Sequence, residues 1–275
     1  MLFDSPIPFR EAVASAAARG LLPTSATSAE LQALDGAIKR RATFSATVES
    51  VRVLQGLAAG VDAVLSGVAT QKEVREQLLD LHLALGTQPG PGRPGGTGDV
   101  TSRARADLQV RTLTETAQGL GWHAQGLQAD VLDAYPAQEL TRFVTPRTRS
   151  RDWPARWAKA GGRFFGRRMV ALKTDPIWAR LGDPALFPDA LGNPYPPFAF
   201  NSGMDVQDVD RAEAEALGLI DRATVPQGAS LLASVGGDEA NGPQVTQTWL
   251  RDAIQAGGLG RFDAAGVLRM IGGGA

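Results

Sequence analysis

Cysteine is absent from the 275-residue chain, and histidine occurs twice. Without cysteine, disulfides, thiolate metal sites and cysteine nucleophiles are excluded. The scarcity of histidine leaves little material for a Ser-His-Asp triad or a histidine-rich metal site, and His82 and His123 both fall in helical patterns where core or surface roles are commoner. We therefore expect no catalytic set, no metal and no cofactor.

Long apolar runs and aromatic residues are also scarce. No run approaches the roughly 18 apolar residues of a membrane span, and the first residues lack a signal-peptide pattern, so we expect a cytoplasmic product without membrane contact. Aromatic residues make up 6% of the chain, against 43% hydrophobic residues in all. This composition favours helices packed through small side chains over an aromatic-cored β-sandwich.

The apolar spacing predicts an α+β fold that is mainly α. Residues 1–85 read as a helical region, with helices over 7–19, from Thr27, within 31–65 and over 70–85. Gly86 to Gly98 holds six glycines and three prolines, so residues 86–99 are predicted to be a mobile or extended linker between two halves. Residues 100–220 form a compact mixed domain, and residues 221–275 an acidic, helical tail.

Within the second half, short elements are expected. They are a helix over 101–134 interrupted after Gly121, strands over 138–144 and 169–172, a helix capped by Asp152, another from Asp175, one starting at Asp205 or Asp208 and ending at Gly218, and two more over 244–255 and 262–270.

Charge is distributed unevenly along the chain. Residues 142–180 carry 11 basic and 2 acidic residues (+9), whereas residues 181–275 carry 5 basic and 12 acidic residues (−7). The split is consistent with a nucleic-acid face, or with pairing of the basic block to the acidic tail within or between subunits. Six cations are the candidate patch for DNA or a partner: Arg147, Arg149, Arg163, Arg167, Arg168 and Lys173. Against a nucleic-acid role, Trp153 and Trp157 have the i, i+4 spacing of a buried helix face.

Residues 193–204, which we call the strap, cannot form a helix because their three prolines lack N–H donors and extend the preceding residues. The strap is predicted to be an extended ribbon that buries its rings and turns at Asn201-Ser202-Gly203. Such a ribbon either pins elements together or docks on a neighbour. The candidate contact residues are Tyr195, Pro196, Pro197, Phe198, Phe200 and Asn201. After it, Asp205, Asp208 and Asp210 suit a helix start better than an Mg²⁺ site.

Three pieces of sequence together resemble a known family. They are Arg151-Asp152-Trp153 to Arg156-Trp157 with Ala160-Gly161-Gly162, Arg168 to Lys173 with Asp175-Pro176-Ile177-Trp178, and Tyr195 to Met204 with Asp210-Arg211. This set resembles head-morphogenesis (minor head) proteins of tailed phages and prophages, in a branch related to the Mu F-type family. The Arg111-Thr112 to Glu115 helix is similar to the Arg-Thr-Glu helix of those proteins.

The resemblance is strongest over 100–220 and implies a structural protein of the virion head. Such a protein is assembled in the host cytoplasm and contacts the portal or major capsid protein, with self-association and contact with packaged DNA as further expectations. Many relatives carry a Cys/His constellation that suggests bound metal; because this chain has no cysteine, neither metal nor catalytic residues carry over. The alternative is a packaged toxin-like enzyme, a nuclease or an ADP-ribosyltransferase-like domain.

Overall fold

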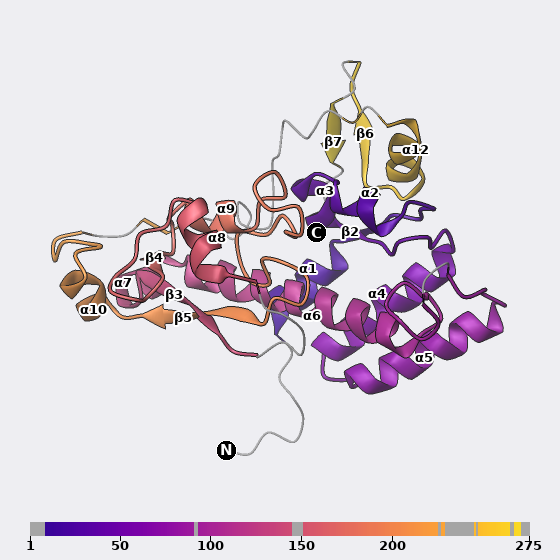
Figure 1. The fold of residues 1–275 in the computed structure, drawn as a ribbon, viewed down its shortest axis with the longest axis horizontal. Helices are drawn as coiled ribbons and strands as arrows, with labels where there is room; N and C mark the ends of the chain where they lie inside the picture. Colours follow the sequence, from indigo (N-terminus) through magenta and orange to yellow (C-terminus); the bar gives the residue numbers. More distant parts are fainter. Residues whose placement is uncertain are drawn as a thin grey trace. The chain divides into compact units, whose positions relative to one another are not determined.

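The computed structural model describes residues 9–90, 93–144, 151–224, 227–228, 245, 247–264 and 267–270. Contacts divide the chain into two compact units, Met1–Gln118 with Asp238–Ala275 (unit 1) and Gly119–Gly237 (unit 2). Helices dominate and short strands accompany them (Figure 1), so the predicted α+β, mainly α fold is confirmed. No helix in the described part of the chain is long and apolar enough to span a membrane.

Unit 1 is built mainly from helices whose starts are marked by polar caps. Thr70 Oγ1 accepts from Glu73 N at 3.2 Å while Glu73 Oε2 accepts from Thr70 N at 2.8 Å, and Thr27 and Glu30 form the same capping box. The helix starts predicted at Thr27 and Thr70 are confirmed. The elements are α1 (Arg10–Ala17), β1 (Gly20–Leu21), α2 (Ser28–Gln32), α3 (Gly36–Arg41), β2 (Ala42–Thr43), α4 (Val51–Leu65), α5 (Gln71–Ala84), α12 (Thr248–Ala256), β6 (Gly260–Phe262) and β7 (Leu268–Met270).

The core of unit 1 consists of aliphatic clusters. One joins α4 and α5 to α6 (Arg103–Gly126) through residues such as Leu57, Val74 and Val110. Another packs Leu250 and Ile254 of α12, and Leu268 of β7, with Leu22, Ile38 and their neighbours. The described residues after 244, which belong to the acidic, helical tail predicted over 221–275, therefore pack into unit 1.

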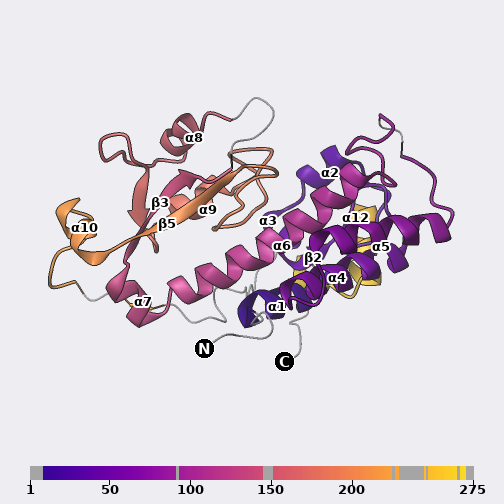
Figure 2. The same ribbon diagram turned by 90° about the horizontal axis from the view of Figure 1, so that it is seen from below.

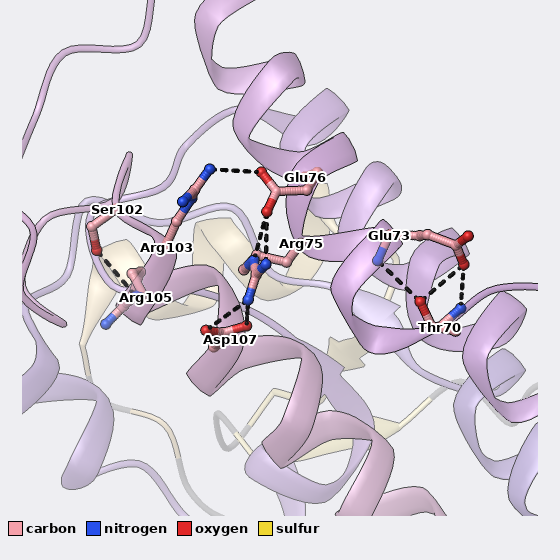
Figure 3. A network of polar contacts seen from close by, with 8 residues as sticks. All are labelled: Thr70, Glu73, Arg75, Glu76, Ser102, Arg103, Arg105 and Asp107. Carbon is pink, nitrogen blue, oxygen red and sulfur yellow. Dashed lines mark hydrogen bonds and ion pairs between the residues drawn. The ribbon is translucent and has the colours of Figure 1, made fainter.

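The Gly/Pro-rich segment joins two helices of the same unit. Arg75 of α5 pairs with Asp107 of α6 at 3.1 Å, and Glu76 pairs with Arg103 at 3.4 Å (Figure 3). Next to the segment, Asp99 accepts from the N–H groups of Gly95 and Thr101, both at 3.0 Å. The chain divides instead between Gln118 and Gly119, inside α6, which differs from the predicted boundary at 86–99.

Unit 2 is organised around a three-stranded antiparallel sheet of order β4-β3-β5. Strands β3 and β5 lie side by side in it (Figure 2). All six residues of β3 pair with β5, from Ala137 with Val209 to Arg142 with Met204. The strands predicted over 138–144 and 169–172 are confirmed as β3 and β4. The elements are the end of α6, α7 (Ala129–Ala134), β3 (Ala137–Arg142), α8 (Trp153–Lys159), β4 (Val170–Leu172), α9 (Ile177–Leu181), β5 (Met204–Val209) and α10 (Arg211–Ala216).

Three predicted helices are wrong in type or extent. Residues 204–209 form strand β5, and the helix begins only after Asp210, whose Oδ1 accepts from Glu213 N at 2.8 Å. Residues 260–262 and 268–270 form the β6–β7 hairpin in place of a helix over 262–270. Helix α6 runs unbroken through Gly121.

Candidate functional site

The strap is buried inside unit 2. Tyr195 is 2% exposed and Phe198 is fully buried. The Phe198 ring stacks on Trp178 with centroids 6.1 Å apart, and Trp157 meets Trp178 edge-on at 5.4 Å. Pro196 and Pro197, joined by a cis peptide bond, are also buried, whereas Phe200 is half-buried and Asn201 is exposed. Of the two uses that the sequence left open, the structure shows the strap pinning elements of its own unit, so its buried rings are not a free surface for a partner.

Hydrogen bonds and ion pairs fix the strap. Arg151 Nη2 donates to Phe200 O at 2.9 Å, and Asn193 Nδ2 donates to Pro197 O at 3.1 Å. Asp189 pairs with Arg151 and, at 2.7 Å, with Arg156. Burial alone would raise the pKa of Asp189, but hydrogen bonds and charge from the two arginines outweigh burial and lower that pKa.

The turn predicted at the end of the strap is present. Asn201 and Gly203 both have positive φ, 50° and 63°. Asn and Gly tolerate this left-handed conformation, which reverses the chain into β5.

Four of the six predicted cations lie in the part of the chain that the structure describes. Arg147 and Arg149 lie outside the described residues. Arg168 pairs with Glu139 at 2.7 Å and with Glu213, and these hydrogen bonds raise its pKa. Lys173 is 5% exposed and pairs with Asp208 at 2.8 Å. Arg163 and Arg167 are exposed. Two of the four described cations, Arg168 and Lys173, are therefore paired with carboxylates inside the unit.

These ion pairs also explain the uneven charge along the chain. Arg156–Asp189, Arg168–Glu213 and Lys173–Asp208 each join the basic block to the acidic segment that follows it. The pairing expected within or between subunits thus occurs, for these residues, within one chain.

A cavity of about 430 Å³ lies in unit 2, at the sheet. The end of α6 contributes Trp122 and His123, and the strap contributes Tyr195 and Pro196. The remaining lining residues come from elsewhere in the unit: Gly119, Gln125, Gly126, Leu127, Val131, Gln138, Phe143, Lys173, Asp205, Val206 and Asp208. Among the predicted site residues, only Tyr195, Pro196 and Lys173 line it.

The cavity holds ionisable groups whose properties depend on burial. Burial, followed by the nearby Lys173 charge, lowers the pKa of His123 to about 4, so its imidazole is neutral at physiological pH. Burial raises the pKa of the Asp205 carboxyl, partly offset by a hydrogen bond from Val206 N. The His123 ring lies 5.4 Å from Tyr195, centroid to centroid.

One buried polar group in the cavity lacks a protein partner. Gln138, on the central strand β3, is 7% exposed, yet its side-chain amide makes no hydrogen bond to any residue that the structure describes. Sequence reasoning missed Gln138 and Trp122. They come from a strand and from the end of a helix, and no sequence pattern indicates that the fold brings these two elements together.

Metal chemistry has no support in the described ranges, where no group of three or more His, Asp or Glu side chains could hold an ion. Asp205 and Asp208 line the cavity, whereas Asp210 caps α10. Together the cavity offers rings, an amide, a neutral imidazole and a compensated ammonium group. That combination suits binding of a small polar molecule.

Comparison with known proteins adds no relative: no protein family, no curated protein and no solved structure matches this chain.

Proposed function

We propose that this protein is a minor head (head-morphogenesis) protein of a tailed phage or prophage. Its role is structural: it assembles in the host cytoplasm and acts through protein–protein contacts at the portal or inside the capsid. The proposal starts from the sequence resemblance to that family over residues 100–220.

The observation that carries the proposal is the role of the residues on which the resemblance rests. Trp153, Trp157 and Trp178 are each no more than 2% exposed and form the core of unit 2 with Phe198. Asp152 caps α8 through a hydrogen bond from Ala155 N at 3.0 Å, and Arg151 holds the strap. The residues that carry the resemblance therefore form the structural framework of unit 2, which supports a structural role for them.

Co-expression tests the proposal directly. The tagged chain is produced with the portal and major capsid proteins of its phage, and heads are purified by sedimentation. We expect a few copies per head, both in DNA-filled heads and in heads that never packaged DNA if protein contacts suffice. If the chain is missing from empty heads but present in DNA-filled heads, its contact is with DNA. The exposed Arg163 and Arg167 are then the candidate DNA-contacting residues among those described. Normal heads with the chain left in the supernatant would refute the proposal.

The second candidate is a packaged enzyme, either a nuclease or an ADP-ribosyltransferase-like domain. The cavity favours it, since groups with perturbed pKa values such as His123 and Asp205 cluster at functional sites. Nuclease or ADP-ribosyl-transfer activity of the purified chain, lost on changing His123, would replace the first candidate with the second.

A further inference from the structure

The unpartnered amide of Gln138 is the strongest pointer to a ligand in unit 2. Most of the Gln138 residue is buried, but its amide atoms are not among the fully buried polar atoms without a partner, so they remain accessible to a ligand in the cavity. Gln138 lines the cavity and finds no partner among the described residues. A side-chain amide presents a donor and an acceptor next to each other. Its best complement is a ligand edge with an acceptor beside a donor.

The cavity also offers flat apolar faces. Tyr195 and His123 lie ring to ring in its wall. Trp122 and Phe143 also line the cavity while 54% and 62% exposed. Large rings left this exposed around a cavity are typical of a surface that a ligand covers. The complement of such faces is a planar ring system.

Charge in the cavity argues against a buried phosphate. Among the lining residues that the structure describes, the cation is Lys173, and its ammonium group is already paired with Asp208 at 2.8 Å. Asp205 adds a second carboxyl group. The ligand part that enters is therefore uncharged.

Size limits the ligand further. Ligand sites in proteins usually measure about 300–1,000 Å³. At about 430 Å³ this cavity is near the small end, which suits one heterocycle with its sugar better than a dinucleotide.

We infer that this cavity binds a single nucleobase, carried by a free nucleoside or by an unstacked nucleotide of a single strand. A base combines a stacking face with adjacent donors and acceptors on its edge, the pair of features that side-chain amides and aromatic rings read in nucleic-acid sites. Gln138 reads the base edge, and the exposed rings of Trp122 and Phe143 contact its faces. This inference goes beyond the proposed function and does not depend on it.

Ligand titration of the full chain tests the inference, with calorimetry and intrinsic tryptophan fluorescence as readouts. Adenosine and cytidine are expected to bind, and adenosine 5′-monophosphate no more tightly than adenosine. Purine riboside, which lacks the exocyclic donor, is expected to bind about tenfold more weakly, as is indole, which lacks the polar edge. A short oligo(dA) strand distinguishes the sources: tighter binding than adenosine assigns the site to single strands, and equal or weaker binding assigns it to free nucleosides.

Two variants make the test specific. Gln138→Leu should weaken adenosine about tenfold or more while leaving indole unchanged, whereas Gln128→Leu, an exposed glutamine outside the cavity, should change neither. If Gln138→Leu does not fold, Trp122→Ala replaces it in the test. Trp122 is half-exposed, so its removal should weaken adenosine binding without unfolding the protein. Indole binding as tightly as adenosine, no nucleoside binding at millimolar concentration, or full affinity in folded Gln138→Leu would each overturn the inference.

Discussion

The two units stabilise themselves in different ways. Unit 1 packs Leu, Val and Ala from α4, α5 and α6, and its helices begin at polar caps such as the Thr70–Glu73 box. Unit 2 has short helices and a small sheet, and its main core depends on three tryptophans and Phe198 drawn from distant segments. In unit 1 the helices are long, and many contacts between small side chains suffice to stabilise the fold. In unit 2 the elements are short, and a few large rings and buried ion pairs must hold the loops in place.

The largest expected effect sharpens this contrast in unit 2. Trp178 is 1% exposed, stacks on Phe198 and donates from Nε1 to Leu172 O at 2.7 Å. Trp178→Ala should lower the free energy of unfolding by about 3–5 kcal/mol, because it leaves a cavity and an unsatisfied carbonyl.

Urea unfolding followed by near-ultraviolet circular dichroism measures that loss. Trp249→Ala is the matched control in unit 1, since Trp249 is 36% exposed, and it should cost less than about 1 kcal/mol. Equal losses for the two variants would contradict the idea that unit 2 depends on its rings.

A pH-dependent effect comes next. The pKa of His123 is lowered from 6.5 to about 4, so below pH 6.5 the unfolded chain takes up a proton that the folded chain refuses. The corresponding stability is present above pH 6.5 and is lost as the pH falls to 4. It amounts to about 3 kcal/mol, from roughly 1.4 kcal/mol per pKa unit.

His123→Gln isolates this contribution, because carboxyl groups titrate in the same window and remain in both proteins. The difference in free energy of unfolding between the wild type and the variant should shrink steadily from pH 6.5 to pH 4. Imidazole NMR signals give the pKa directly, with His82→Gln assigning the two histidines. A His123 pKa near 6.5 would show that the cavity does not desolvate this ring.

The smallest expected effect compares a glycine from each unit. A Cβ at Gly119 would lie 1.8 Å from the backbone oxygen of Pro196, which is fixed within the strap. A Cβ at Gly56 would lie 2.7 Å from Leu81 Cδ2, the end of a side chain that can turn away. Gly119→Ala should cost about 1–3 kcal/mol through overpacking, whereas Gly56→Ala should be near neutral because alanine favours a helix by up to about 1 kcal/mol.

Thermal unfolding of both glycine variants checks the comparison. Both substitutions add one methyl group to a helix. The difference between their losses in unfolding free energy therefore measures how closely neighbouring atoms of the same unit pack against each helix. A stable Gly119→Ala protein would mean that the strap does not lie against α6.

Sequence reasoning worked where local chemistry decides the structure. Helix starts at Thr27 and Thr70 and the cap at Asp152 were predicted correctly, because a side-chain oxygen satisfies nearby N–H groups whatever the rest of the chain does. It failed at 204–209, where the i, i+3 spacing of Val206 and Val209 fits one face of a helix but places the two side chains on opposite faces of a strand. Pairing of all six residues with β3 selected the strand. The break expected at Gly121 is absent, since α6 runs from Arg103 to Gly126. The nearby Gly119 lies against the backbone of the strap.

The amino-acid sequence by itself determined the helix starts and the predominance of helix. It also determined that the strap, with its prolines and aromatic rings, is not helical. Only the tertiary structure decided which cations are free, since Arg168 and Lys173 meet their carboxylates across segments far apart in the chain. It also decided the cavity, where Gln138, His123 and Tyr195 come from a strand, a helix and the strap. Local propensity acts over a few residues, whereas burial and charge pairing depend on which distant segments the folded core brings together.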